Sequence, residues 1–228
     1  MNGKRHDDFT PYLWKSTDYG ATWTSIVNDL PLGPVNVIKE DPENPDLLYV
    51  GTDLSAYTSI DGGQSWKVLS DELPASYVHD IVIHPRDDIM VAATHGRGMF
   101  ALDVRPIRQL TPEIVTAAVH VLDPGPARLA RGNEPAVRPS IYYWLSTAGA
   151  VTVTVKDARG QTVRDLEGTS DAGLNVAHWD LSGRAQTQPQ GQGGGFGRRG
   201  PPPVAPGIYT VEVRQGGNTA SAQVVVSR

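Results

Sequence analysis

Cysteine is absent from the 228 residues of this sequence. The chain therefore has no disulfide framework, no thiolate nucleophile and no cysteine-ligated zinc site. Long apolar runs are also absent, because no stretch reaches the roughly 18 apolar residues of a membrane span. The N-terminal segment, MNGKRHDDFTPYLW, lacks the apolar core of a signal peptide. The sequence as it stands predicts neither a membrane span nor an export signal.

An excess of positive charge is missing as well. Lys and Arg number 20 against 25 Asp and Glu, so the net charge is −5 at pH 7. The basic residues are scattered along the chain, whereas a protein that binds duplex nucleic acid gathers them on one surface. Nucleic acid is therefore not expected as a partner.

Glycine and proline, in contrast, are plentiful. The chain has 24 Gly and 18 Pro, which predicts many turns and hence many short strands. Hydrophobic residues make up 39% of the chain, which is enough for a sizeable core. A chain of 228 residues has room for two domains, so a boundary is expected.

One octapeptide pattern, Ser-x-Asp-x-Gly-x-x-Trp, occurs twice, as STDYGATW at 16–23 and SIDGGQSW at 59–66. The residue types predict a tight turn in which the Asp carboxylate accepts backbone N–H bonds and Gly takes a positive φ. The Trp then returns to the core. The residues assigned this structural role are Ser16, Asp18, Gly20, Trp23, Ser59, Asp61, Gly63 and Trp66.

The octapeptides belong to a longer repeat. Asp18 and Asp61 lie 43 positions apart, and so do the pairs Asp41–Pro42 and His84–Pro85. One period breaks into four short apolar segments bounded by Pro, Gly or Asp, which is typical of the four strands of a propeller blade. The segments are 35–39, 47–51, 56–60 and 66–69.

The repeat stops early. Residues 9–27, 35–70 and 77–104 make up about two and a half blades, whereas closed propellers usually have four to eight. Such a short array leaves unpaired strand edges. Two explanations stay open: the chain is the C-terminal part of a longer protein, which we favour, or it pairs with another copy. Self-association through the unpaired edges is expected.

A different pattern follows the repeat. Residues 105–137 read as a linker with Pro punctuation and one short helix that begins near Pro112. Residues 138–228 show alternating strands joined by hairpins and predict an antiparallel sandwich. Within it, the Gly- and Pro-rich segment 185–206 predicts a disordered loop. The expected fold is all-β, with propeller blades at 1–104.

The two octapeptides resemble the Asp-box, or bacterial neuraminidase repeat, of sialidases, sortilin-type propellers and glycosyl hydrolase-like bacterial proteins. The segments VKDARGQTVRDLEG, GLNVAHWDLSGR and PGIYTVEV resemble the Ig-like domain of the flagellar hook-capping protein and C-terminal modules of secreted bacterial proteins. Together the two resemblances cover nearly the whole chain. They imply an incomplete Asp-box β-propeller followed by an Ig-like β-sandwich. In the Asp-box family the motif lies on outer blade turns, so it implies no catalytic role for Asp18 or Asp61.

Residues that could carry chemistry gather in the last partial blade. A His beside a carboxylate can act as a general base, and an Arg can stabilise an oxyanion. The candidate catalytic residues are His95, Arg97, His84 and Asp80. They lie in a polar set that also contains His79, Arg86, Asp87 and Asp88. The alternative is structural: the carboxylates cap turns and Arg97 packs on backbone carbonyls.

Two acidic loops could hold a calcium ion, which takes six to eight oxygen ligands. The first is EDPENPD at 40–46, and the second contains the metal-ligand candidates Asp87 and Asp88. Neither has EF-hand spacing. Four aromatic residues of the second domain could instead stack on a sugar, although strand alternation places at least one of them in the core. They are Tyr142, Tyr143, Trp144 and Trp179.

These observations favour a binding or scaffolding module of a secreted, periplasmic or cell-surface bacterial protein, with a glycan or a protein as partner. The alternative, which the resemblance implies, is a hydrolase with its site in the last blade. It would be glycosyl hydrolase-like or a calcium-dependent lactonase or esterase, acting on a glycoside or lactone. In that case His84 or His95 is the base and Arg97 stabilises the oxyanion.

Overall fold

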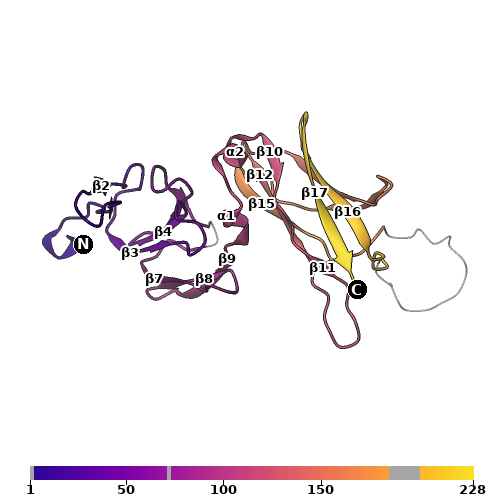
Figure 1. Cartoon of the computed structure of the whole chain (residues 1–228), viewed down its shortest axis with the longest axis horizontal. Helices are drawn as coiled ribbons and strands as arrows, with labels where there is room; N and C mark the ends of the chain where they lie inside the picture. The colour runs from indigo at the N-terminus through magenta and orange to yellow at the C-terminus, as the bar shows by residue number, and fades with distance from the viewer. Residues whose placement is uncertain (1–2, 71–72, 185–200) are drawn as a thin grey trace, which may run out of the picture. The chain divides into compact units, whose positions relative to one another are not determined.

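The computed structural model describes residues 3–70, 73–184 and 201–228. The chain forms two compact units, Met1–Pro112 and Glu113–Arg228, which are coloured indigo to magenta and magenta to yellow in Figure 1. The prediction of an all-β chain is confirmed, and the sheets are consistent with an incomplete propeller and a β-sandwich. In the described part of the chain, no helix has the length and apolar character to cross a membrane.

The first unit contains three small antiparallel sheets in chain order. The orders are β1-β2, β3-β4-β5-β6 and β7-β8-β9, so each strand pairs with its neighbour along the chain. The elements are η1 (Lys4–His6), β1 (Trp14–Lys15), β2 (Thr24–Ser25), β3 (Val35–Glu40), β4 (Leu48–Thr52), β5 (Ala56–Ser59), β6 (Lys67–Val68), β7 (Val78–Ile83), β8 (Ile89–Thr94), β9 (Gly98–Asp103) and α1 (Arg105–Arg108).

The middle sheet has a hydrophobic core on each of its two faces. Strand β4 is buried along its whole length, and its successive side chains point to opposite faces. Leu48 and Val50 pack with residues of the β1-β2 segment, whereas Leu47 and Tyr49 pack with the β7-β8-β9 sheet. The sheets of the first unit are therefore stacked face to face, and each interface is closed by apolar side chains.

Gly51 on β4 allows the second and third sheets to approach closely. A Cβ placed there would lie 2.7 Å from Cγ1 of both Val37 and Val78. Because both neighbours are stiff β-branched residues, Gly51→Ala is expected to lower the free energy of unfolding by about 1–3 kcal/mol. Urea denaturation measures this. Gly217→Ala, where no atom lies within 4 Å, is the control, and equal stability of the two variants would contradict the prediction.

The second unit is a sandwich of two sheets. One has the order β10-β12-β15, and the other has the order β11-β17-β16-β13-β14, with β11 parallel to β17. The elements are α2 (Pro112–Thr116), β10 (Val119–Val121), β11 (Ala127–Arg128), β12 (Ser140–Leu145), β13 (Val151–Lys156), β14 (Thr162–Leu166), β15 (Gly173–His178), β16 (Gly207–Gln215) and β17 (Asn218–Ser227). Alternate residues such as Ile141, Tyr143 and Leu145 form its core.

The segment 105–137 contains more regular structure than a linker. A short helix begins at Pro112, and β10 and β11 then join the two sheets of the sandwich, which therefore starts before residue 138. The reason is that Val119 and Val121 are buried on one side of β10. Residues 185–200 of the predicted loop lie outside the described residues. Residues 201–206, the end of the predicted loop, contact the sandwich, because the Val204 N–H donates to the Leu181 carbonyl at 2.9 Å.

Candidate functional site

The two octapeptide turns form the same hydrogen bonds. In the first, the Ser16 hydroxyl donates to Asp18 Oδ1 at 2.9 Å and accepts from the Gly20 N–H at 2.7 Å. The Thr22 hydroxyl and N–H donate to the two oxygens of Asp18 at 2.6 and 2.8 Å. These bonds, from the Thr22 hydroxyl first, lower the pKa of Asp18 to about 2. The carboxylate is the centre of the turn.

The second turn repeats this network. The Ser59 hydroxyl donates to Asp61 at 2.7 Å, and Ser65 donates to it through its hydroxyl at 2.6 Å and its N–H at 2.9 Å. Burial alone raises the pKa of Asp61, but these hydrogen bonds outweigh it and the pKa is lowered. Gly20 and Gly63 take φ values of 91° and 92°. These hydrogen bonds to each Asp carboxylate all come from its own turn.

The tryptophans of the two turns differ in their surroundings. Trp66 is 3% exposed, and its indole N–H donates to the Ile26 carbonyl of the preceding sheet at 2.8 Å. Trp23 is 61% exposed, and its indole N–H donates to Gly20 within its own turn at 3.1 Å. A preceding sheet therefore covers one ring and not the other.

The predicted catalytic residues do not gather at one place. His95 and Arg97 follow β8, at the edge of the third sheet where β7 begins, and Asp80 lies two residues into β7. His84 follows the other end of β7, about 20 Å away for a strand of six residues. Both Arg97 and Asp80 are exposed, and Asp80 lies 3.9 Å from Lys39 Nζ. His84 and His95, the two alternative bases of the hydrolase hypothesis, therefore lie at opposite ends of β7.

His84 has a structural contact instead. Its Nδ1 accepts the N–H groups of Asp87 at 3.2 Å and Arg86 at 3.4 Å. Asp41, one repeat earlier, accepts the Glu43 N–H in the same way at 2.9 Å. The His84 ring therefore replaces an Asp carboxylate as the acceptor of the turn between β7 and β8.

The two acidic loops converge on an arginine. The Nε of Arg108, on α1, donates to both carboxylate oxygens of Asp41 at 3.1 and 3.0 Å. Its Nη1 pairs with Glu43 at 3.1 Å and with Asp88. The Asp41 and Arg108 side chains are 0% and 10% exposed. The guanidinium thus occupies the place where the acidic loops could have held a cation.

Asp87 does not join this ion cluster. Its carboxylate pairs with Arg86 at 3.2 Å and lies 3.3 Å from His84. Among the residues that the structure describes, no group of three or more His, Cys, Asp or Glu is arranged to hold a metal ion. The two predicted metal ligands, Asp87 and Asp88, therefore have different partners.

Three rings lie together at the edge of the third sheet where β7 begins. The ring centroids of Tyr77 and His79 are 4.5 Å apart, those of His79 and His95 are 5.7 Å apart, and those of Tyr77 and His95 are 6.3 Å apart. His79 and His95 are exposed, whereas Tyr77 is half-buried. The chain thus presents a small surface of rings in tilted and edge-on contact to solvent.

Polar groups extend this surface toward the second sheet. Lys4 Nζ lies 4.7 Å from the Tyr77 ring centroid and 2.7 Å from Asp53. Asp53 also accepts the side-chain amide N–H of Asn36 at 3.0 Å, while the Asn36 Oδ1 atom is buried without a hydrogen-bond partner. We call this set the Tyr77 cluster. Its residues are Lys4, Asn36, Asp53, Tyr77, His79 and His95.

The repeat explains why these residues meet. Asn36 and His79 are 43 positions apart, and each is the extra residue of an irregular pairing at the start of β3 or β7. Asp53 and His95 each follow the second strand of their sheet. Of the six residues, the sequence pattern indicates only His79 and His95 as candidates. Aligning the two repeats would have found Asn36 and Asp53.

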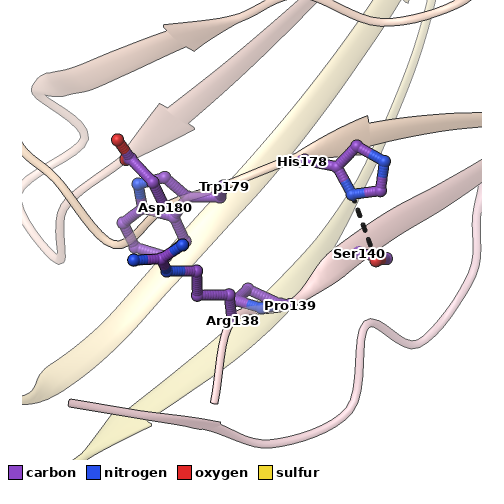
Figure 2. A pocket seen from close by; sticks show the side chains of 6 residues that line it. All are labelled: Arg138, Pro139, Ser140, His178, Trp179 and Asp180. Carbon is purple, nitrogen blue, oxygen red and sulfur yellow. Dashed lines mark hydrogen bonds between the residues drawn. The ribbon is translucent and has the colours of Figure 1, made fainter. Parts of the chain in front are cut away.

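The second unit has a serine beside a histidine, but not a catalytic triad. Ser140 Oγ lies 3.2 Å from His178 Nδ1, across the pairing of β12 with β15 (Figure 2). The Asp180 carboxylate of the same pocket accepts the N–H of Ser182 at 2.9 Å. Figure 2 shows Asp180 directed away from His178. The aspartate therefore does not orient the imidazole, as a triad requires.

The predicted aromatic surface of the second unit is divided by strand alternation. Tyr143 and Trp179 are core residues at 0% and 1% exposure. Tyr142 and Trp144 lie half-buried on the opposite face of β12.

Comparisons with known proteins identify no family for this chain. No family model matches it, and no curated protein matches it. Among solved structures, the extracellular domain of a hybrid two-component system from B. thetaiotaomicron matches with 8% identity and a TM-score of 0.31. The alignment covers 96% of this chain and 29% of that chain, so this chain spans less than a third of it.

Proposed function

We propose that this chain is a binding module in which the Tyr77 cluster is the ligand site and a glycan is the ligand. The observation that carries the proposal is the meeting of three rings, an amide and a carboxylate at the same edges of two stacked sheets. As part of the same proposal, the module consists of Asp-box blades followed by an Ig-like domain. It belongs to a secreted or cell-envelope protein.

The chemistry of the cluster suits a sugar. Exposed rings such as those of His79 and His95 pack against the C–H face of a pyranose, and hydroxyl groups then need partners at the rim. The Asn36 Oδ1 atom is buried without a partner, which makes it an acceptor for an O–H bond from a sugar hydroxyl. Asp53 is held by Lys4 and Asn36, which fixes its carboxylate before a ligand arrives.

The same geometry gives less support to the hydrolase alternative. Of the two histidines considered as alternative bases, His84 already accepts two backbone N–H bonds at its Nδ1 atom. A general base needs a free nitrogen within hydrogen-bond reach of the proton it removes. His95 stays accessible, so the experiment below includes an activity measurement.

A glycan array followed by isothermal titration calorimetry tests the proposal. We expect His95→Ala to weaken binding of the best glycan at least tenfold, because it removes an exposed ring of the Tyr77 cluster. His84→Asn is the matched control, since Asn can accept the same turn N–H bonds at the far end of β7. It should bind as tightly as the unmodified chain.

Two results would contradict the proposal. One is the absence of glycan binding by the folded chain, and the other is binding that His95→Ala leaves unchanged. Aryl glycosides, aryl esters and lactones are assayed in parallel, with and without calcium. Turnover by the unmodified chain that disappears in His95→Ala while the fold is retained would contradict the binding-module proposal and support the hydrolase alternative.

A further inference from the structure

The first sheet presents an uncovered aromatic face. Trp14 and Trp23 are 54% and 61% exposed. Trp14 pairs with Ser25, which is two residues from Trp23, so both indoles lie on the same face of the β1-β2 pair. The opposite face carries Leu13 and Ile26, which are buried against the second sheet. We call the exposed side the Trp14/Trp23 face.

The repeat shows what such a face contacts when it is covered. Tyr57 and Trp66 lie 43 positions after Trp14 and Trp23, and they are 7% and 3% exposed. They pack in one core with residues of the preceding sheet, which include Leu13 and Ile26. The same pair of aromatic positions is therefore a buried sheet-to-sheet interface in the second sheet and an open face in the first.

A second open face lies on the third sheet. Val82, Val91 and Ala101 stand in one cross-strand row, and Met99 is in the next row on the same side. Val82 and Met99 are 58% and 77% exposed. The other side of this sheet, with Ile81, is buried against the second sheet. We call the side that carries Val82, Val91, Met99 and Ala101 the Met99 face.

The second sheet again shows how such a face is covered. Tyr49 and Ala56 lie 42 and 43 positions before Val91 and Met99, and both are 0% exposed. They pack against the third sheet, together with Met90 and Ala92. The Met99 face thus corresponds to a face that a following sheet covers, just as the Trp14/Trp23 face corresponds to one that a preceding sheet covers.

We propose that a second copy of this chain covers these faces, with the Trp14/Trp23 face of one copy packed on the Met99 face of the next. The interface would continue the stacking that the chain already forms between its own sheets. The indole N–H of Trp23 already has the Gly20 carbonyl as acceptor, so burial of this ring does not leave its donor unpaired. Such head-to-tail contact is heterologous and builds rings or open chains.

Sedimentation velocity over a wide concentration range tests this proposal, which does not depend on the glycan site. The unmodified chain should associate as concentration rises. Trp23→Glu and Met99→Glu should each weaken self-association at least tenfold, because each removes one of the two faces. An equimolar mixture of the two variants should form a one-to-one dimer, since each keeps the face that the other lacks.

The mixture distinguishes head-to-tail contact from the alternatives. Val225→Glu, an exposed apolar position of the second unit at 57%, is the control and should associate like the unmodified chain. If Trp23→Glu changes the circular dichroism spectrum, Trp14→Glu is used in its place. If Met99→Glu does so, Val82→Glu is used in its place. A monomeric unmodified chain at all concentrations, Met99→Glu that still self-associates, or a mixture that stays monomeric would each overturn the proposal.

Discussion

Replacing Trp66 with alanine is expected to lower the free energy of unfolding by about 3–5 kcal/mol, whereas Trp23→Ala should cost less than about 1 kcal/mol. The two residues occupy the same position of the same octapeptide. Trp66 is 3% exposed and bonded to the preceding sheet through the Ile26 carbonyl, but Trp23 is 61% exposed. The difference follows from cavity formation, because only Trp66→Ala removes a ring from a packed interface.

Urea denaturation, followed by circular dichroism and by tryptophan fluorescence, measures both variants. Each variant is the control for the other, since the turn hydrogen bonds of Asp18 and Asp61 stay intact in both. Equal losses at the two positions would mean that the motif stabilises its own turn only. They would contradict the sheet-to-sheet role of Trp66.

Removing the Arg108 side-chain charge is the second substitution with a large expected effect. Arg108→Met leaves the Asp41 carboxylate, which is 0% exposed, without its cationic partner. Breaking a buried ion pair in this way costs about 3–5 kcal/mol, because an uncompensated charge stays buried. The cost should appear as a lower urea midpoint for the first unit.

Arg86→Met is the matched control for this prediction. Arg86 also pairs with an aspartate, Asp87, but its side chain is 82% exposed. Exposed ion pairs contribute about 0–1 kcal/mol, so the control should stay close to the unmodified chain. If Arg108→Met were as stable as Arg86→Met, the ion cluster would not hold α1 against the acidic loops.

Features that depend on neighbours in sequence could be predicted from the sequence. All hydrogen bonds of the Asp61 carboxylate come from residues 59–65, so the octapeptide itself supplies the network around this carboxylate. The 43-residue period and the short apolar segments then indicated the sheets of the first unit. The same local patterns indicated the strands of the sandwich.

The candidate site could be predicted only in part, because its contacts join residues that are distant in sequence. Lys4 and Asp53 are separated by 49 positions and meet only when the sheets stack. His84 and His95 are closer in sequence, but an antiparallel pairing places them at opposite ends of β7 and β8. Residues 79 and 95 are the ones that such a hairpin brings together.

The position of Arg108 between the two acidic loops could not be predicted from the sequence for the same reason. The acidic loops can be recognised in the sequence, but Arg108 lies 67 positions after Asp41, in a segment whose sequence predicts a linker. Nothing local to either loop indicates that a guanidinium comes to lie between them. Because α1 packs beside both loops in the folded chain, the cation that the carboxylates contact is the guanidinium of Arg108.

The most direct test of the Tyr77 cluster as a glycan site is an NMR titration that observes the six histidine imidazoles separately. The titrant is the best glycan from the array. We predict that the signals of His79 and His95 shift and saturate together, while those of His84 and His178 stay in place. Shifts confined to His178, or no shift at His79 and His95 at saturating glycan, would contradict the proposed site.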